Sequence, residues 1–162
     1  MDAVIVFVAN YLYLFVILIL GIAVLQESKD KRVKFVAAII VSGIIAFILS
    51  RIAGKIYYDK RPFVREHIKP LFYHKPDNGF PSDHALLTGT LTAIAYFYNK
   101  KWATVMLIPT ILIGIARVLA RVHSPLDIAG GWVFGIIGSF AGYYLVEWYF
   151  KRRSAKSIPS VK

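Results

Sequence analysis

The chain has 162 residues, 57% of them hydrophobic and 18% charged, and its mean hydropathy is +0.59. Soluble domains contain about 45–50% apolar and about 25% charged residues, so this composition excludes an ordinary water-soluble domain and favours a membrane bilayer as partner. The net charge of +11 does not indicate nucleic-acid binding, because the basic residues lie in short segments between apolar runs. The absence of cysteine excludes disulfides, thiolate metal sites and a cysteine nucleophile.

Two apolar runs near the start of the chain predict membrane-spanning helices. Residues 3–25 carry no charge, and a polar hinge at 26–34 leads into a second helix over 33–57. About 20 apolar residues are enough to span a bilayer. The first run has no basic residue ahead of it, so we interpret it as a retained anchor rather than a cleaved signal. The second helix is expected to end before the Arg-Pro pair at 61–62, because proline disfavours helical geometry in the residue before it.

A long charged connection follows at 58–80, and its segment 63–73 is expected to form a short amphipathic surface helix. Apolar stretches that follow helix-start signals or turns predict three more helices, over 82–98, 102–121 and 125–150. The first of these three is rich in glycine, alanine and threonine, which favours close packing among other helices.

These elements predict an all-α fold, a polytopic membrane helix bundle with about five transmembrane helices and one short amphipathic surface helix. We expect one integral membrane domain over 1–162, with its core at 33–150 and a basic cytoplasmic tail at 151–162. The sequence leaves the oligomeric state open, since the glycines of the last helix suit packing within one chain or between two.

Five spans bring the segments 58–84 and 117–127 to the same face of the membrane. These segments hold all four histidines and most other reactive side chains. The segments expected at the opposite face hold 11 lysine and arginine residues, against 6 at the face with the histidines. The positive-inside rule therefore predicts a multi-pass protein of the cell membrane, with the reactive residues at the outer face.

The tetrapeptide Pro81-Ser82-Asp83-His84 begins the third predicted span. Ser82 is expected to cap the helix, and a helix amino terminus that carries a hydroxyl and an imidazole favours an anion such as phosphate. An ordinary cap with a surface histidine is the alternative interpretation.

A second cluster contains Arg117, His123 and Asp127. Arg117 lies in an apolar helix, where an unpaired guanidinium is costly, so a carboxylate, a carbonyl or a bound phosphate is expected beside it. Asp127 follows Ser124 by three residues, the spacing of a capping box. Alternatively, its carboxylate accepts the Nδ1–H of His123 and leaves Nε2 free to attack phosphorus.

Two more cations, Lys55 and Arg61, are expected to extend the positive charge around this cluster. Arg51 lies one helical turn before Lys55, and it either joins them or snorkels to the membrane surface.

Together, these motifs resemble the three signature blocks of the type 2 phosphatidic-acid phosphatase superfamily. That pattern reads Lys-(x6)-Arg-Pro, Pro-Ser-Gly-His and Ser-Arg-(x5)-His-(x3)-Asp, and the resemblance extends from about 50 to 135. The corresponding residues here are Arg61-Pro62, Pro81-Ser82-Asp83-His84, and Ala116-Arg117 with His123 and Asp127.

The resemblance implies a role for each matching residue. His123 would be the nucleophile that forms a phosphohistidine, Asp127 would orient it, and His84 would protonate the leaving group and then activate water. The implied phosphate-binding residues are Arg61, Ser82, Asp83, Arg117 and Lys55. The resemblance also implies that no metal or other cofactor takes part.

Three positions depart from the family pattern. Five residues separate Lys55 from Arg61 where the pattern has six, so Lys60 is an alternative for the lysine role. Ala116 replaces a serine, which removes one hydrogen bond to phosphate at most. Asp83 replaces a glycine and brings a carboxylate near an anionic substrate, which is unfavourable unless an arginine or the helix dipole compensates it.

Pro-Ser-Asp-His, together with Ala-Arg, His-(x)-Pro-Leu-Asp and Gly130-Gly131, resembles the undecaprenyl-diphosphatase branch, which implies conversion of undecaprenyl diphosphate to undecaprenyl phosphate. A phosphatase of phosphatidylglycerophosphate, phosphatidic acid or lipid A 1-phosphate is the alternative within the superfamily. Outside it, the alternatives are a non-enzymatic protein that binds anionic lipid through its charged loop and a zinc hydrolase that uses the histidines. His67 and His74 are expected to face solvent or lipid head groups.

Overall fold

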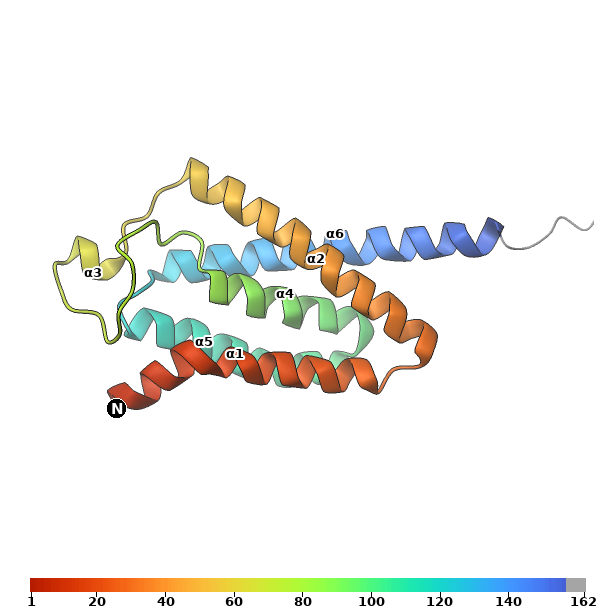
Figure 1. Cartoon of the computed structure of the whole chain (residues 1–162), viewed down its shortest axis with the longest axis horizontal. Helices are drawn as coiled ribbons and strands as arrows, with labels where there is room; N and C mark the ends of the chain where they lie inside the picture. Colours follow the sequence, from red (N-terminus) through yellow and green to blue (C-terminus); the bar gives the residue numbers. More distant parts are fainter. Residues whose placement is uncertain (157–162) are drawn as a thin grey trace, which may run out of the picture.

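The computed structural model describes residues 1–156, and six helices make up most of them (Figure 1). Four helices, α1, α2, α5 and α6, are long and apolar enough to cross a membrane. The helix α4 has 16 residues, which at 1.5 Å per residue is shorter than a hydrocarbon core of about 30 Å. The helices are α1 (Asp2–Leu25), α2 (Lys29–Ile56), α3 (Pro62–Arg65), α4 (Asp83–Tyr98), α5 (Lys100–Leu119) and α6 (Pro125–Lys156).

The predicted all-α membrane bundle is therefore confirmed, with the third of the five expected spans realised as the short α4. The second helix begins at Lys29, earlier than expected, because Ser28 occupies the cap position and the charged residues after it form the first turn. The helical part of the predicted basic tail, 151–156, continues α6 beyond the rest of the bundle (Figure 1). The remainder of that tail lies outside the described residues.

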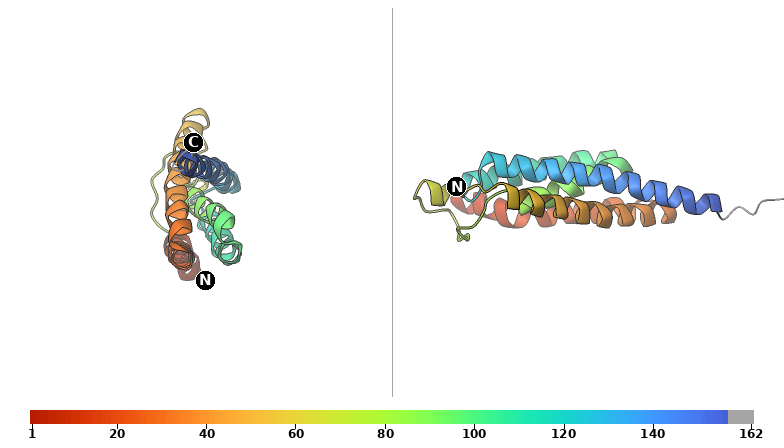
Figure 2. Two further views of the ribbon diagram at one scale, coloured as in Figure 1. Left: turned by 90° about the vertical axis from the view of Figure 1, so that its right-hand side faces the viewer. Right: turned by 90° about the horizontal axis from the view of Figure 1, so that it is seen from above.

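The short α4 is the central element of the bundle and packs against all four long helices. Around it, α1 packs on α5 and α2 packs on α6, whereas α1 barely touches α2 and α5 barely touches α6. Figure 2 shows the bundle from its end and from above, with α1 and α2 on one side. Two shallow seams therefore flank α4, one between α1 and α2 and one between α5 and α6.

Small residues let α4 and α6 approach each other closely, as the sequence predicted. A methyl group added at Gly135 would lie 2.7 Å from the backbone nitrogen of Thr90, so the backbones are nearly in contact. The hydroxyl of Thr90 donates to the carbonyl of Leu86 at 2.7 Å, which removes the cost of burying it. Close packing on every side explains why the helix can be short and only moderately apolar.

One end of the bundle holds the amino terminus, the 57–82 connection and the 120–124 turn (Figure 1). The 26–28 turn, Asn99 and the carboxyl end of α6 lie at the other end. At that second end Lys34 forms an ion pair of 3.0 Å with Glu147, and Lys31 donates to the carbonyl of Tyr98 at 2.7 Å. The prediction that 58–84 and 117–127 share one face is confirmed.

The prediction of a surface helix over 63–73 is wrong. Only one turn forms, α3, because His67 adopts a left-handed φ of 54° and Pro70 disfavours helical geometry at the residue before it. The rest of the connection is an irregular loop that is tied to the 120–124 turn, with the Leu71 amide donating to the carbonyl of Ala120 at 3.2 Å. This loop covers the end of the bundle (Figure 1).

Candidate active site

A polar cavity of about 590 Å³ opens at the loop end of the bundle, between α2, α4, α5 and the 57–82 connection. Four cationic side chains line it, those of Arg51, Lys55, Arg61 and Arg117, together with three imidazoles. Arg61 and Arg117 are buried, which strengthens their field, since a low dielectric screens charge poorly. The other lining residues are Ser50, Gly54, His74, Asp77, Asn78, Phe80, Pro81, Asp83, His84 and His123.

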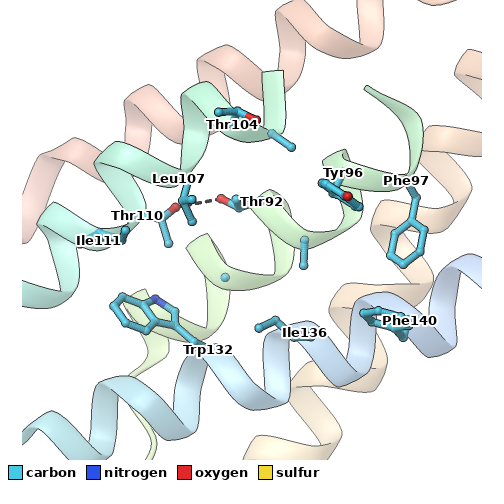
Figure 3. A pocket seen from close by; sticks show the side chains of 13 residues that line it. Thr92, Tyr96, Phe97, Thr104, Leu107, Thr110, Ile111, Trp132, Ile136 and Phe140 are labelled. Atoms are coloured by element: carbon cyan, nitrogen blue, oxygen red, sulfur yellow. Dashed lines mark hydrogen bonds between the residues drawn. The ribbon is translucent and has the colours of Figure 1, made fainter. Parts of the chain in front are cut away.

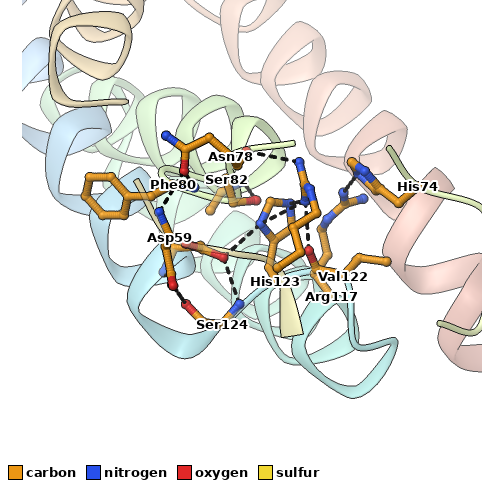
Figure 4. Close-up of polar contacts among 12 residues, drawn as sticks. Asp59, His74, Asn78, Phe80, Ser82, Arg117, Val122, His123 and Ser124 are labelled. Atoms are coloured by element: carbon orange, nitrogen blue, oxygen red, sulfur yellow. Dashed lines mark hydrogen bonds and ion pairs between the residues drawn. The ribbon is translucent and has the colours of Figure 1, made fainter. Parts of the chain in front are cut away.

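His123 and Asp127 come together as the sequence predicted. The Nδ1 of His123 lies 3.2 Å from Oδ2 of Asp127, and Nε2 lies 3.2 Å from NH1 of Arg61 (Figure 4). The same NH1 also lies 3.5 Å from Nδ1, so the contact with Asp127 decides the tautomer: the carboxylate can only accept, which places the imidazole proton on Nδ1. His123 is 3% exposed and Asp127 is fully buried. In this tautomer Nε2 is unprotonated and lies beside the guanidinium of Arg61.

The carboxylate of Asp127 also caps α6, so it makes both of the contacts that the sequence suggested. Its Oδ2 accepts the amide of Ser124 at 2.8 Å, and the Ser124 hydroxyl accepts the amide of Asp127 at 3.2 Å. This reciprocal pair is a capping box. It fixes Oδ2, which also contacts Nδ1 of His123, while Oδ1 is buried and has no hydrogen-bond partner among residues 1–156.

Arg117 is 2% exposed and finds the carbonyl partner that its place in an apolar helix requires. Its NH1 donates to the carbonyl of Ala9 in α1 at 3.3 Å, and its NH2 lies 3.1 Å from Nε2 of His74. The guanidinium carbon lies 5.8 Å from the centre of the Phe72 ring. Arg117 therefore connects α1, α5 and the loop, and it presents a cation to the cavity.

Arg61 is held by hydrogen bonds along the edge of its guanidinium. Its Nε donates to Asp77 at 2.8 Å, and its NH1 donates to the carbonyl of Val122 at 2.8 Å. Asn78 keeps this part of the loop in place, since its side-chain amide donates to the carbonyl of Gly54 at 2.8 Å. Arg61 is thereby fixed over His123 before any ligand arrives.

His84 and Ser82 lie at the start of α4, in different environments. His84 lines the cavity, and its ring meets the ring of Tyr13 edge-on, with centroids 5.3 Å apart. Ser82 is fully buried behind the cavity lining, and its hydroxyl accepts the amide of Ala85 at 3.5 Å. The predicted cap of α4 is therefore confirmed.

The carboxylate of Asp83 is compensated by an arginine. Arg51 of α2 forms a hydrogen-bonded ion pair with it across the mouth of the cavity. Arg51 thus pairs with a carboxylate instead of only snorkelling to the surface. Lys55 lines the cavity, whereas Lys60 pairs by its backbone with Asn78 and lies outside the lining.

The place of His74 in the cavity was not predicted from the sequence. We expected it to face solvent or head groups, but it lines the cavity, and its ring centroid lies 5.8 Å from that of His123. Its spacing from the other histidines carries no signal, because the path of an irregular loop sets its position. His67, by contrast, is exposed as predicted.

Burial and neighbouring cations keep the loop imidazoles of the site neutral. Burial, with help from the charges of Arg61 and Arg117, lowers the pKa of His74 to about 4. Burial also lowers the pKa of His123, although its hydrogen bond to Asp127 opposes the shift. At neutral pH both side chains are therefore uncharged.

The donor set of the cavity suits an anion better than a metal cation. Its two carboxylates, Asp77 and Asp83, are paired with Arg61 and Arg51. Among residues 1–156, no group of three histidine, aspartate or glutamate side chains is arranged to hold a metal ion.

A second cavity of about 560 Å³ lies in the seam between α5 and α6, over α4 (Figure 3). Its walls are mainly aliphatic and aromatic, with Tyr96, Phe97, Trp132 and Phe140 among them. The hydroxyls of Thr92 and Thr110 in its wall bond to each other at 2.8 Å, whereas the buried indole nitrogen of Trp132 has no hydrogen-bond partner within the described residues. It contains no charged residue.

The model of the PAP2 superfamily matches residues 31–151. The chain therefore belongs to this superfamily, which confirms the resemblance carried by the three motifs. The fold agrees, since the crystal structure of a transmembrane PAP2 type phosphatidylglycerolphosphate phosphatase from Bacillus subtilis covers 99% of this chain, with a TM-score of 0.59. That match covers 79% of the other chain at 15% identity, and it supports the fold alone.

Similarity to individual proteins points to one branch of this superfamily. The bacitracin transport permease protein BcrC of Bacillus licheniformis is 30% identical over 140 residues, which cover 86% of this chain and 68% of that protein. The undecaprenyl-diphosphatase BcrC of Bacillus subtilis is 27% identical over 141 residues, with coverages of 86% and 72%. An undecaprenyl-diphosphatase of Sulfolobus acidocaldarius is 30% identical over 122 residues, with coverages of 73% and 58%. The chain is thus a multi-pass membrane protein of the lipid phosphatase class, similar to the undecaprenyl-diphosphatase branch.

Proposed function

We propose that this protein removes the terminal phosphate of an isoprenyl diphosphate, converting undecaprenyl diphosphate to undecaprenyl phosphate through a phosphohistidine intermediate. The observation that carries the proposal is the arrangement of His123. Its Nδ1 is held by Asp127, and its ring lines a cavity that Arg61 and Arg117 make positive, with the unprotonated Nε2 3.2 Å from NH1 of Arg61. A neutral imidazole with a fixed tautomer beside two guanidinium groups suits attack on a phosphoryl group.

In the first step, Nε2 of His123 attacks the terminal phosphorus. A P–N bond forms while the bond from phosphorus to the bridging oxygen breaks, and the lipid monophosphate leaves. His84 lines the same cavity and is the candidate that gives a proton to the departing oxygen. The negative charge of the bound diphosphate favours the protonated imidazolium of His84, which this step requires.

In the second step, water attacks the phosphohistidine. His84, now neutral, takes a proton from the water as the P–O bond forms and the P–N bond breaks, which releases inorganic phosphate and restores His123. Asp127 stabilises the positive charge that His123 acquires while phosphorylated. The enzyme returns to its starting protonation state at the end of the cycle.

The phosphate contacts are assigned to Arg61, Arg117 and Lys55, whose positive charges replace those that a metal ion would supply. We propose on this basis that the reaction is metal-independent. Arg51 holds Asp83 at the mouth and limits its repulsion of the substrate. A contact from Ser82 requires its hydroxyl to exchange the capping bond with Ala85 for a phosphoryl oxygen.

A lipid substrate is supported by an apolar groove that meets the polar cavity. The groove has a volume of about 260 Å³, lies between α2 and α4, and includes Phe47, Leu87 and Leu91 in its wall. Asp83 lines both the groove and the polar cavity. The helices α1 and α2 diverge towards the loop end, and the groove lies between α2 and α4 on that side of the bundle (Figure 1). We assign the groove to the isoprenyl chain next to its diphosphate.

The distribution of basic residues supports a proposal for the side of the membrane at which the cavity opens. The end of the bundle opposite the cavity carries the greater number of basic residues, so we propose that the cavity opens at the outer face of the cell membrane. The choice of undecaprenyl diphosphate rests on the names of the relatives together with the motif pattern.

The test is phosphate release by the purified protein in detergent with EDTA. Undecaprenyl diphosphate is compared with phosphatidylglycerophosphate, phosphatidic acid and lipid A, and His123→Ala is the blank. We expect release from the isoprenyl diphosphate that the substitution abolishes. Preference for another lipid contradicts the assigned substrate and keeps the mechanism. Release that persists in His123→Ala contradicts the phosphohistidine, and a loss of activity with EDTA contradicts metal independence.

A further inference from the structure

His74 is the one imidazole of the cavity that the three family motifs do not include. The loop places it beside the last turn of α5, where its Nε2 lies 3.1 Å from NH2 of Arg117 (Figure 4). Its ring stands nearly perpendicular to that of His123, at 79° and with centroids 5.8 Å apart. It therefore lies on the same side of the cavity as the candidate nucleophile.

The contact with Arg117 fixes which nitrogen of His74 carries the proton. A guanidinium has only donors, so Nε2 must be the acceptor, and in the neutral ring the proton is on Nδ1. This Nδ1 is buried, and no acceptor within the described residues meets hydrogen-bond geometry with it, although the nearby backbone of Lys75 favours the protonated ring. A buried donor without an acceptor costs free energy, so an acceptor is expected when the site is occupied.

Burial and the surrounding charges keep His74 neutral. Burial is the main cause that lowers its pKa to about 4, and the charges of Arg61 and Arg117 and the nearby ring of His123 add to it. The backbone of Lys75 opposes the shift but does not reverse it. His74 thus holds one uncharged N–H in the wall of the cavity, beside two cations.

We propose that His74 contacts the substrate directly: its Nε2 holds Arg117 in position, and its Nδ1–H donates a hydrogen bond to an oxygen of the phosphoryl group. This inference rests on the proposed phosphatase function, whose site it extends. It makes the irregular loop a part of the phosphate-binding site.

Two substitutions test the two proposed hydrogen bonds of His74 one at a time. His74→Gln places an amide oxygen near the position of Nε2, so it retains an acceptor for Arg117 and loses the Nδ1 donor. His74→Asn places an amide nitrogen near the position of Nδ1, so it retains the donor and loses the acceptor. His74→Ala removes both, and His67→Ala is the matched control, since it changes an exposed histidine in the same loop.

The readouts are kcat/KM for phosphate release and inhibition by orthovanadate, a phosphate analogue. We expect His74→Gln and His74→Asn to lower kcat/KM by about 10-fold each, and His74→Ala by about 100-fold, because each bond involves a charged partner. Orthovanadate should inhibit the Gln and Ala variants more weakly than the wild type. His67→Ala should match the wild type within about 2-fold, and a shared thermal midpoint shows that the variants are folded.

Wild-type kinetics in His74→Gln contradict the phosphoryl contact, and wild-type kinetics in His74→Asn contradict the support of Arg117. A His74→Ala variant that behaves like His67→Ala overturns the whole inference. Orthovanadate binding, followed by the thermal midpoint, separates this failure from that of the proposed function. If the wild type binds orthovanadate through His74 but releases phosphate from none of the lipids, the proposed substrate class fails while the His74 contact holds.

Discussion

The bundle contains two cavities of similar volume and opposite chemistry. The one at the loop end, of about 590 Å³, is lined by four cations and three imidazoles. The one between α5 and α6, of about 560 Å³, has no charged residue in its wall. Both lie against α4, so the same helix contributes to both.

The two cavities differ in charge rather than in how completely their polar groups are satisfied. In the apolar cavity the Thr92 and Thr110 hydroxyls bond to each other, but the buried indole nitrogen of Trp132 has no hydrogen-bond partner within the described residues. In the polar cavity, Nδ1 of His74 and Nε of Arg117 likewise have none within those residues. A cationic lining attracts an anionic ligand, whereas an uncharged lining does not. Charge, rather than volume, identifies the functional cavity.

Of the substitutions that test this difference between the two cavities, Asp127→Asn is expected to lower kcat/KM the most. The amide has nearly the shape of the carboxylate but cannot stabilise a cationic His123, and it can favour the wrong tautomer. We expect kcat/KM for phosphate release to fall by about 1,000-fold. The control is Asp59→Asn, which changes the carboxylate that accepts the Ser124 hydroxyl at 2.8 Å. Equal activity of the two variants would show that Asp127 serves only as a helix cap.

Arg117→Lys keeps one positive charge in the polar cavity and removes the planar fork. A lysine cannot reach both Ala9 and His74 while it contacts phosphate, so we expect kcat/KM to fall by about 100-fold. Arg51→Lys is the matched control at the mouth of the cavity, where the ion pair with Asp83 is partly exposed. A loss confined to Arg51→Lys would move the phosphate contact from the interior to the mouth.

The pH at which His123 becomes protonated should change by a smaller amount, and the direction of the change follows from the causes that shift its pKa. Because burial lowers its pKa, the neutral and nucleophilic form persists below the ordinary value of about 6.5 and is lost only as the pH falls further. Asp127→Asn removes the opposing hydrogen bond and should lower the midpoint again. NMR titration of protein labelled with ¹⁵N-histidine, assigned with His123→Ala, measures both midpoints. A wild-type midpoint above 6.5 would contradict a nucleophile that is held neutral.

Thr92→Val tests the apolar cavity and should have the smallest effect on activity. The substitution leaves Thr110 without its partner, so we expect a loss of about 1 kcal/mol in the free energy of unfolding. Phosphate release should stay within about 2-fold of the wild type, because the cavity is lined by no residue of the site. A large change in kcat/KM with an unchanged thermal midpoint would mean that the apolar cavity takes part in function.

Much of the fold could be predicted because its signals are local. The uncharged run of α1, the Ser82 cap of α4 and the Pro125 start of α6 each depend on a few neighbouring residues, and the observed boundaries agree. The surface helix at 63–73 was wrong because the left-handed turn at His67 has no clear sequence signal.

The site was predictable to the extent that it lies on helices or next to their ends. The pairing of His123 with Asp127 follows from their spacing of four residues across a helix start. The contact of His74 with Arg117 joins positions 43 residues apart, and the path of an irregular loop decides it. The ion pair of Arg51 with Asp83 likewise depends on how α2 lies against α4. Long-range packing sets both, and one sequence carries no direct signal of it.

Detection of the covalent intermediate tests the central claim most directly. Protein in detergent is mixed with undecaprenyl diphosphate labelled with ³²P in its terminal phosphate, quenched within milliseconds in alkali and digested. The account predicts label on the peptide that contains His123, stable in alkali and lost in acid, and absent from His123→Ala. Rapid release of labelled phosphate by the wild type, with no label on the protein at any quench time, would contradict it and would favour direct attack by water.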